Sequence, residues 1–167
     1  MEFFTINDDF KSIIENEVGQ VVSMNQISTG WTNFVYEVST SDNEYIFRFP
    51  RNNFFSSVLE KEVAFSKFIK GKIKTQTSNI RLGRHNGRPF TCHNKIDGRS
   101  LTCVYDLLTV EEKEKIAEQV SEFIYELQQV PLDSIPLQLQ TTSEFLAELS
   151  HVDDVYYDLK QGFLVQV

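Results

Sequence analysis

An alternating run of residues followed by a helix with an inward-facing acid constrains the fold of this chain most. Residues 45–50 (Tyr-Ile-Phe-Arg-Phe-Pro) alternate as in a β-strand, which places Ile46 and Arg48 on one face and the three aromatic side chains on the other. The following helix carries Glu62 on its apolar side. Because an unpaired buried charge is costly, this carboxylate needs a cation, and Arg48 is the nearest candidate. The sequence therefore predicts an ion pair between the strand and the helix.

The helix itself is expected over residues 57–69. Ser57 and Glu60 have the spacing of a capping box, which marks a helix start. Glu62 shares one helical face with three apolar side chains, at steps of three and four residues: Val58, Phe65 and Ile69. In an alternative interpretation, Glu62 is a partly exposed carboxylate at the edge of this apolar stripe.

Composition limits the class of protein. The 167 residues contain 41% hydrophobic residues, which is typical of a globular chain large enough to bury a core. A net charge of -8 argues against a general binder of nucleic acid or anionic membranes, although a few local cations suffice for a nucleotide. No apolar stretch approaches a membrane span, the amino terminus lacks a basic signal region, and Cys92 and Cys103 have no metal-ligand spacing. We expect a cytoplasmic, reduced protein.

The order of predicted elements indicates an α+β lobe. A short amphipathic helix over 7–17 precedes three strands in a meander, the predicted helix 57–69 and two further strands. His85-Asn86-Gly87-Arg88-Pro89 predicts a tight hairpin between the last two. The five strands are expected at 21–28, 34–38, 45–49, 80–82 and 90–96. Five antiparallel strands with one inserted helix therefore form a lobe that ends near Ile96.

The sequence becomes mainly helical after Gly98. Thr109 and Glu112 form a second capping box, which opens a long helix. Its buried side is predicted to consist of Ile116, Val120, Phe123, Ile124 and Leu127. A last helix is expected over 143–160.

Five segments, in this order, resemble the amino-terminal half of the aminoglycoside phosphotransferase family, a branch of the kinase-like superfamily. They are Thr29–Tyr36, Tyr45–Phe49, Glu62, Lys95–Thr102 and Phe123–Leu127. The resemblance covers roughly residues 21–130 and is greatest to the 2''-phosphotransferases. It implies a nucleotide-binding small lobe over 1–97 and a hinge with the first helices of a partial second lobe over 98–167.

The resemblance assigns the loop before the second strand to the nucleotide. Thr29, Gly30 and Asn33 would belong to a loop whose backbone N–H groups cradle phosphate oxygens, and Val35 and Ile46 would cover the purine ring. Taken alone, Gly30 and Val35 could equally be a hairpin glycine and a core valine.

Arg48 falls where the family places a cation against the α- and β-phosphates, and Glu62 matches the acid that steadies this cation. Two alternatives remain open. The pair could serve stability only, or Arg51 could contact the phosphates instead. Asn94 to Ile96 corresponds to the hinge, where backbone groups would bond the edge of the base; the other interpretation is an edge strand that leaves the domain.

The resemblance also implies a His-x-Asp catalytic loop and a later metal-binding Asp. The sequence contains only one segment with a similar pattern. His151-Val152-Asp153, with Asp158 five residues later, lies in an apolar periodicity typical of a helix. We therefore expect these to be solvated helix residues, and we assign no catalytic and no metal-binding residue.

Three functions remain open. The first is the nucleotide-binding part of an antibiotic-resistance kinase that moves a γ-phosphoryl group from ATP or GTP, with Mg²⁺ in the whole enzyme, to a hydroxyl of an aminoglycoside-type molecule. This chain would then be truncated and inactive without the missing second-lobe polypeptide. The second is a stand-alone nucleotide-binding or partner-docking module, for which a homodimer is expected. The third is a complete enzyme that uses His151 and Asp153.

Overall fold

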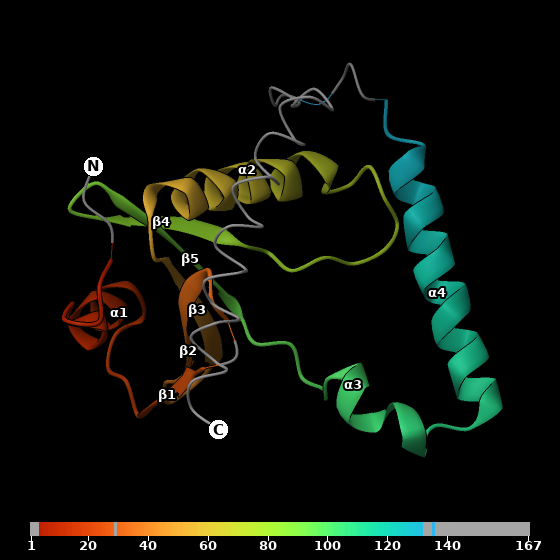
Figure 1. Cartoon of the computed structure of the whole chain (residues 1–167), viewed down its shortest axis with the longest axis horizontal. Helices are drawn as coiled ribbons and strands as arrows, with labels where there is room; N and C mark the ends of the chain where they lie inside the picture. The colour runs from red at the N-terminus through yellow and green to blue at the C-terminus, as the bar shows by residue number, and fades with distance from the viewer. Residues whose placement is uncertain (1–3, 29, 132–134, 136–167) are drawn as a thin grey trace, which may run out of the picture. The chain divides into compact units, whose positions relative to one another are not determined.

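The fold is built on a five-stranded antiparallel sheet (Figure 1). In this computed structural model, residues 4–28, 30–131 and 135 are described; Thr29 and the predicted helix 143–160, with His151, Asp153 and Asp158, lie outside them. The strands follow the spatial order β1-β2-β3-β5-β4 and have these bounds: β1 Ser23–Ile27, β2 Asn33–Ser39, β3 Glu44–Pro50, β4 Arg81–His85 and β5 Arg88–Asn94. The predicted α+β fold with five antiparallel strands is confirmed.

The hairpin between β4 and β5 turns at the predicted residues. Asn86 and Gly87 both have positive φ, at 51° and 79°, as the two central residues of a type I′ turn require. Gly83 in β4 lies opposite Phe90 in β5. A methyl group at Gly83 would collide with the ring of Phe90. Glycine is therefore needed here because the aromatic ring occupies the space of a side chain.

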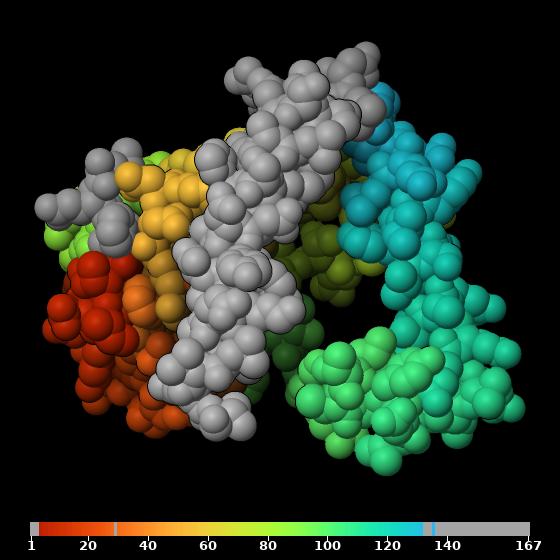
Figure 2. Space-filling model, in the orientation of Figure 1, coloured from red at the N-terminus to blue at the C-terminus, as the bar shows by residue number. Residues whose placement is uncertain are grey.

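One face of the sheet buries an aromatic core beneath helix α1 (Phe10–Val18). Phe47 and Phe49 share this face, as the alternation of the third strand predicts, and both are fully buried. Phe10 from α1 packs on Phe49 with ring centroids 4.9 Å apart. The other buried members are Phe4, Ile13, Ile14, Phe34, Tyr36, Val38, Phe90 and Cys92. Figure 2 shows α1 and the first strands as one continuous mass of atoms, in red and orange.

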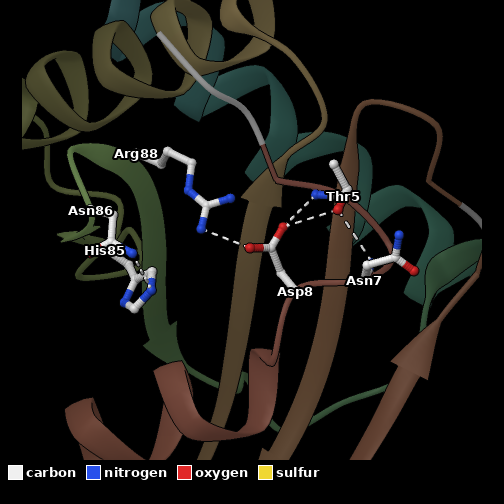
Figure 3. A network of polar contacts seen from close by, with 6 residues as sticks. All are labelled: Thr5, Asn7, Asp8, His85, Asn86 and Arg88. Atoms are coloured by element: carbon white, nitrogen blue, oxygen red, sulfur yellow. Dashed lines mark hydrogen bonds and ion pairs between the residues drawn. The ribbon is translucent and has the colours of Figure 1, made fainter.

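An ion pair fixes the segment before α1 to the sheet. Arg88 of β5 lies 2.7 Å from the carboxylate of Asp8, and both side chains are largely buried. The other carboxylate oxygen accepts a hydrogen bond of 2.7 Å from the backbone N–H of Thr5, so that Asp8 is held from two sides (Figure 3). Burial raises the pKa of Asp8, but the bonds from Arg88 and Thr5 outweigh it and hold the pKa below its usual value.

Helix α2 (Asn53–Ile69) packs against the opposite face, over β3, β4 and β5. It begins four residues earlier than predicted, because the side chain of Asn52 accepts a bond from the N–H of Phe55 and caps the helix. The predicted capping box of Ser57 and Glu60 is therefore wrong. Its buried face contains Ser56, Leu59, Val63 and Ile69, whereas Val58 is 46% exposed, contrary to expectation.

The chain continues through α3 (Leu101–Val104), the 3₁₀ helix η1 (Tyr105–Leu107) and α4 (Val110–Gln128). The capping box of Thr109 and Glu112 is confirmed. The predicted buried side of α4 is wrong for Val120 and Ile124, which are each about half exposed. Within the described residues, the last turns of α4 join a second apolar cluster, in which Phe123 and Leu127 pack with Ile69, Ile73 and Val130.

The chain divides into two compact units, residues 1–136 and 137–167, and everything described belongs to the first. The proposed boundary near residue 97 stays a prediction. Within the described residues no helix has the length and apolar character to cross a membrane.

Candidate functional site

Arg48 and Glu62 form the predicted ion pair between β3 and α2. Nη1 and Nη2 of Arg48 donate to the two carboxylate oxygens of Glu62 over 2.7 and 2.6 Å. Both side chains remain partly accessible, at 24% and 38%. A bidentate pair of this kind fixes the plane and direction of the guanidinium, which a single contact does not do. Glu62 lies at the edge of the buried stripe of α2, so it is both partly exposed and paired.

The ion pair with Glu62 does not use all the N–H donors of Arg48. A guanidinium carries five N–H groups, and the bond to Glu62 uses one on each terminal nitrogen. Nε–H and the remaining N–H of Nη2 point in parallel along another edge of the same plane. No described residue accepts a hydrogen bond from this edge. It is therefore a fixed cationic fork of the type that matches two oxygens of a phosphate group.

Two apolar side chains share the face of Arg48. Val35 in β2 is the direct cross-strand partner of Arg48, and Ile46 lies two residues before Arg48 in β3. Both are half-buried. Directly opposed and alternate residues of antiparallel strands point to the same side of the sheet. The structure thus brings the predicted ring-covering residues and the predicted phosphate-binding cation onto one surface.

The loop that enters β2 contributes a buried amide. The side chain of Asn33 is 8% exposed, and its Nδ2 donates to Thr32 Oγ1 over 2.8 Å. Its Oδ1 has no hydrogen-bond partner among the described residues. Such an unsatisfied buried acceptor is rare and costs free energy until a donor reaches it. Gly30 has no positive φ, and a methyl group there would make ordinary contacts of 3.9 Å, so its backbone does not itself demand glycine.

Arg51, the alternative cation, is engaged elsewhere. Its guanidinium lies 4.3 Å from the centroid of the Phe34 ring, in a cation–π arrangement. Phe34 belongs to the core under α1, so Arg51 is directed to the side of the sheet that Arg48 does not face. The geometry therefore favours Arg48 over Arg51 as the cation of this surface.

At the predicted hinge, some backbone groups are already hydrogen-bonded and others are not. The carbonyl of Asn94 accepts a bond of 2.8 Å from His93 Nδ1 and keeps a second lone pair, while the N–H of Lys95 is used by the carbonyl of Glu44. The N–H of Ile96 bonds to no described residue, and the Ile96 side chain is 69% exposed. Asn94 and Ile96 thus offer one acceptor and one donor with the i, i+2 spacing that suits the edge of a flat heterocycle.

Lys95 forms a charge cluster that the sequence did not reveal. Its Nζ lies 2.9 Å from Glu37 and 3.3 Å from Glu44. The hydrogen bonds to Glu37 and Glu44 raise the pKa of Lys95 above its usual value. Strand alternation could have found this cluster, since Glu37 follows Val35 by two residues and Glu44 precedes Ile46 by two.

A pocket of about 420 Å³ adjoins the hinge on the side of the sheet away from Arg48. It lies between residues 76–79 and residues 94–96, and Arg81 also lines it. Arg81 Nη2 contacts Cys92 Sγ at 3.3 Å, and Cys92 belongs to the core under α1. Arg81 is therefore on the α1 side of the sheet, so this pocket does not include the surface that carries Arg48. In the described part of the chain no group of three or more His, Cys, Asp or Glu side chains is arranged to hold a metal ion.

The sequence matches the profile of the phosphotransferase enzyme family (APH) over residues 23–161, which is most of the chain. The chain belongs to this family. A comparison with curated protein sequences gave no significant match.

Solved structures of aminoglycoside phosphotransferases share the fold. Aminoglycoside 2'-phosphotransferase-IIIa in complex with GDP superposes with a TM-score of 0.70 at 21% identity, over 90% of this chain and 52% of that one. A mutant of the same enzyme, also with GDP, gives 0.70 at 22% identity with the same coverage. The gentamicin complex of APH(2")-IIa gives 0.66 at 15% identity, over 94% of this chain and 52% of that one. The chain spans about half the length of these enzymes, and its described lobe has their kinase-like α+β fold.

Proposed function

We propose that this lobe binds a purine nucleoside triphosphate, ATP or GTP, as the nucleotide-binding part of a small-molecule phosphotransferase. The observation that carries the proposal is the Arg48 guanidinium, fixed by Glu62 and left with a free donor fork beside Val35 and Ile46. Family membership and the GDP bound by two structural neighbours support it.

In the proposed complex each group has one task. The purine lies over Val35 and Ile46, and its edge bonds to the Asn94 carbonyl and the Ile96 N–H. The fork of Arg48 bonds the α- and β-phosphate oxygens, while the loop from Thr29 to Asn33 covers the phosphates. Because Glu62 already orients the guanidinium, little side-chain entropy is lost on binding.

The parent reaction would transfer the γ-phosphoryl group to a hydroxyl of an aminoglycoside-type molecule, as the names of the neighbours suggest. The bond from the γ-phosphorus to the bridging oxygen breaks, a new bond to the hydroxyl oxygen forms, and the nucleoside diphosphate leaves. The hydroxyl proton requires a base, and we assign that base and any magnesium ligands to groups outside the described residues. The described lobe supplies binding and orientation. We expect phosphate transfer to require those groups in addition to the described lobe.

Calorimetry with ATP and with GTP tests this proposal. Arg48→Ala should weaken triphosphate binding roughly 10-fold or more, the range for loss of charge-assisted hydrogen bonds. Arg51→Ala is the matched control and should bind like the wild type, since its guanidinium faces Phe34. Equal affinities of the two variants would refute the assignment.

A second candidate function, a docking module that pairs with another copy of the chain, is favoured by exposed apolar side chains on the helical segment. Leu107 and Val110 are 75% and 70% exposed, and Val120 and Ile124 are about half exposed. The native mass in solution separates the two functions: a stable dimer that binds no triphosphate supports docking, and a monomer that binds triphosphate supports the first proposal.

A further inference from the structure

An aromatic contact joins the loop before β2 to the start of α2. The ring of Trp31 meets the ring of Phe55 edge to face, with centroids 5.3 Å apart and an interplanar angle of 85°. Edge-to-face pairs of this geometry are favourable because the positive edge of one ring meets the negative face of the other. Trp31 remains 50% exposed, so the indole adds little to the core, and its main described ring partner is Phe55.

The contact connects the loop to the helix that carries Glu62. Phe55 and Glu62 belong to the same α-helix and are seven residues apart, about two turns along one rigid element. On the loop side, the carbonyl of Thr32 accepts a hydrogen bond of 3.1 Å from the N–H of Arg51, the residue that follows β3. The loop is therefore anchored through its backbone to the residue after β3, and through Trp31 to α2.

We propose that Trp31 is a positioning residue for the triphosphate and acts through Phe55. The contact holds the phosphate-covering loop at a fixed place relative to Arg48 and Glu62, so that loop N–H groups and the guanidinium fork meet the phosphates together. This inference rests on the proposed nucleotide binding. It goes beyond that proposal because it makes the loop and α2 one unit, with an aromatic pair as the connection.

The first experiment examines the contact without nucleotide. Trp31 is the only tryptophan in the sequence, so its fluorescence reports on this site alone. Phe55→Ala should increase the quenching of Trp31 by acrylamide, because the indole loses its covering ring. Phe54→Ala is the matched control and should leave the quenching of Trp31 unchanged. Phe54 is adjacent and 45% exposed, and the centroids of its ring and the Phe55 ring lie 5.4 Å apart. Unchanged quenching in Phe55→Ala overturns the proposal.

The second experiment measures triphosphate and nucleoside affinity by calorimetry, with ATP and adenosine or with GTP and guanosine. Trp31→Ala and Phe55→Ala should each weaken triphosphate binding roughly 2- to 10-fold, the effect of losing one aromatic pair. Nucleoside affinity should not change, since the base lies over Val35 and Ile46. The double variant should lose no more than either single one, because both remove the same contact. Phe55→Leu, which keeps apolar volume, guards against misfolding and should behave as Phe55→Ala.

The outcomes separate this inference from the proposed function. If the wild type binds triphosphate in an Arg48-dependent manner and Trp31→Ala binds equally well, only the positioning role is overturned. Additive losses in the double variant also overturn it. A wild type that binds no triphosphate overturns both proposals.

Discussion

Arg88 and Asp8 form an ion pair of 2.7 Å between the start of β5 and the segment that leads into α1. The Arg88 guanidinium also lies 4.2 Å from the centroid of the Phe4 ring. Together these contacts fasten the amino-terminal segment over the aromatic core. Asp8 is the described carboxylate in which burial and hydrogen bonding compete most clearly, and hydrogen bonding prevails.

The lowered pKa of Asp8 predicts a loss of stability in acid. A carboxylate whose pKa is lower in the folded than in the unfolded protein stabilises the fold above the unfolded-state pKa, and this contribution disappears as the pH falls through the folded-state pKa. For Asp8 the loss should begin below pH 3.8, its usual pKa. Asp8→Asn should remove about 1.5–2 kcal/mol at neutral pH, toward the lower end of the range for hydrogen bonds to charged groups.

Urea unfolding of both proteins from pH 7 down to pH 2 checks this prediction. The difference in unfolding free energy between wild type and Asp8→Asn should shrink below pH 3.8. Asp42→Asn, in the exposed turn between β2 and β3, is the control, and its unfolding free energy should follow that of the wild type at each pH. A constant difference across the whole pH range would contradict the ion-pair explanation.

Glu62→Gln should separate a binding role from a stabilising one. Partly exposed ion pairs contribute at most about 1 kcal/mol to stability, so the unfolding midpoint should change little. Triphosphate affinity should fall roughly 10-fold, because the Arg48 guanidinium loses its fixed orientation. Calorimetry and thermal unfolding of the same samples measure both quantities.

Glu60→Gln serves as the matched control for that variant. Glu60 lies two residues before Glu62 in α2 and pairs with Arg84 of β4. Its loss should leave triphosphate affinity unchanged. If both variants weaken binding equally, the effect belongs to the charge of α2 as a whole and not to the orientation of Arg48.

Glu126 of α4 should protect two backbone amides that follow α2. Its carboxylate accepts bonds from the N–H groups of Lys74 and Thr75 over 3.1 and 3.0 Å. The backbone bond from Thr75 lowers the pKa of Glu126 despite some desolvation. Glu126→Ala should therefore speed hydrogen exchange at these two amides, measured by NMR, whereas Glu122→Ala, one turn earlier and exposed, should not.

The same linkage gives Glu126 a pH dependence. Since its pKa is lower in the folded protein, the protection of Lys74 and Thr75 should be complete at neutral pH and decline as the pH falls below 4.5, its usual pKa. Protection that persists unchanged through this range would show that another acceptor holds the amides.

Gly83→Ala should destabilise the sheet by about 1–3 kcal/mol, the usual cost of overpacking, because its methyl group would enter the space of the Phe90 ring. Chemical unfolding measures the loss. A second substitution, Phe90→Leu, removes the ring and should make the added methyl group far less costly. If Gly83→Ala costs the same in both backgrounds, the clash with Phe90 is not its cause.

The sequence alone predicted much of the frame, because local rules dominate there. Alternation from 45 to 50 placed Phe47 and Phe49 on one face and Arg48 on the other, and Asn86-Gly87 located the hairpin turn. It also predicted the Arg48–Glu62 pair, since an acid on an apolar helix face has few cations within reach. The predicted start of α2 was wrong. Asn52 caps the helix by itself, before the apparent capping box of Ser57 and Glu60, which does not form.

What remained undetermined by sequence depends on contacts between distant segments. Periodicity marks Val120 and Ile124 of α4 as apolar, but whether they are buried depends on which element covers them, and in the described structure they are half exposed. Likewise, Trp31 and Phe55 are 24 positions apart, and only the packing of α2 beside the loop brings their rings together. Alternation and capping act over a few residues and are written in the sequence, whereas such pairings follow from the path of the whole chain and were decided by the tertiary structure.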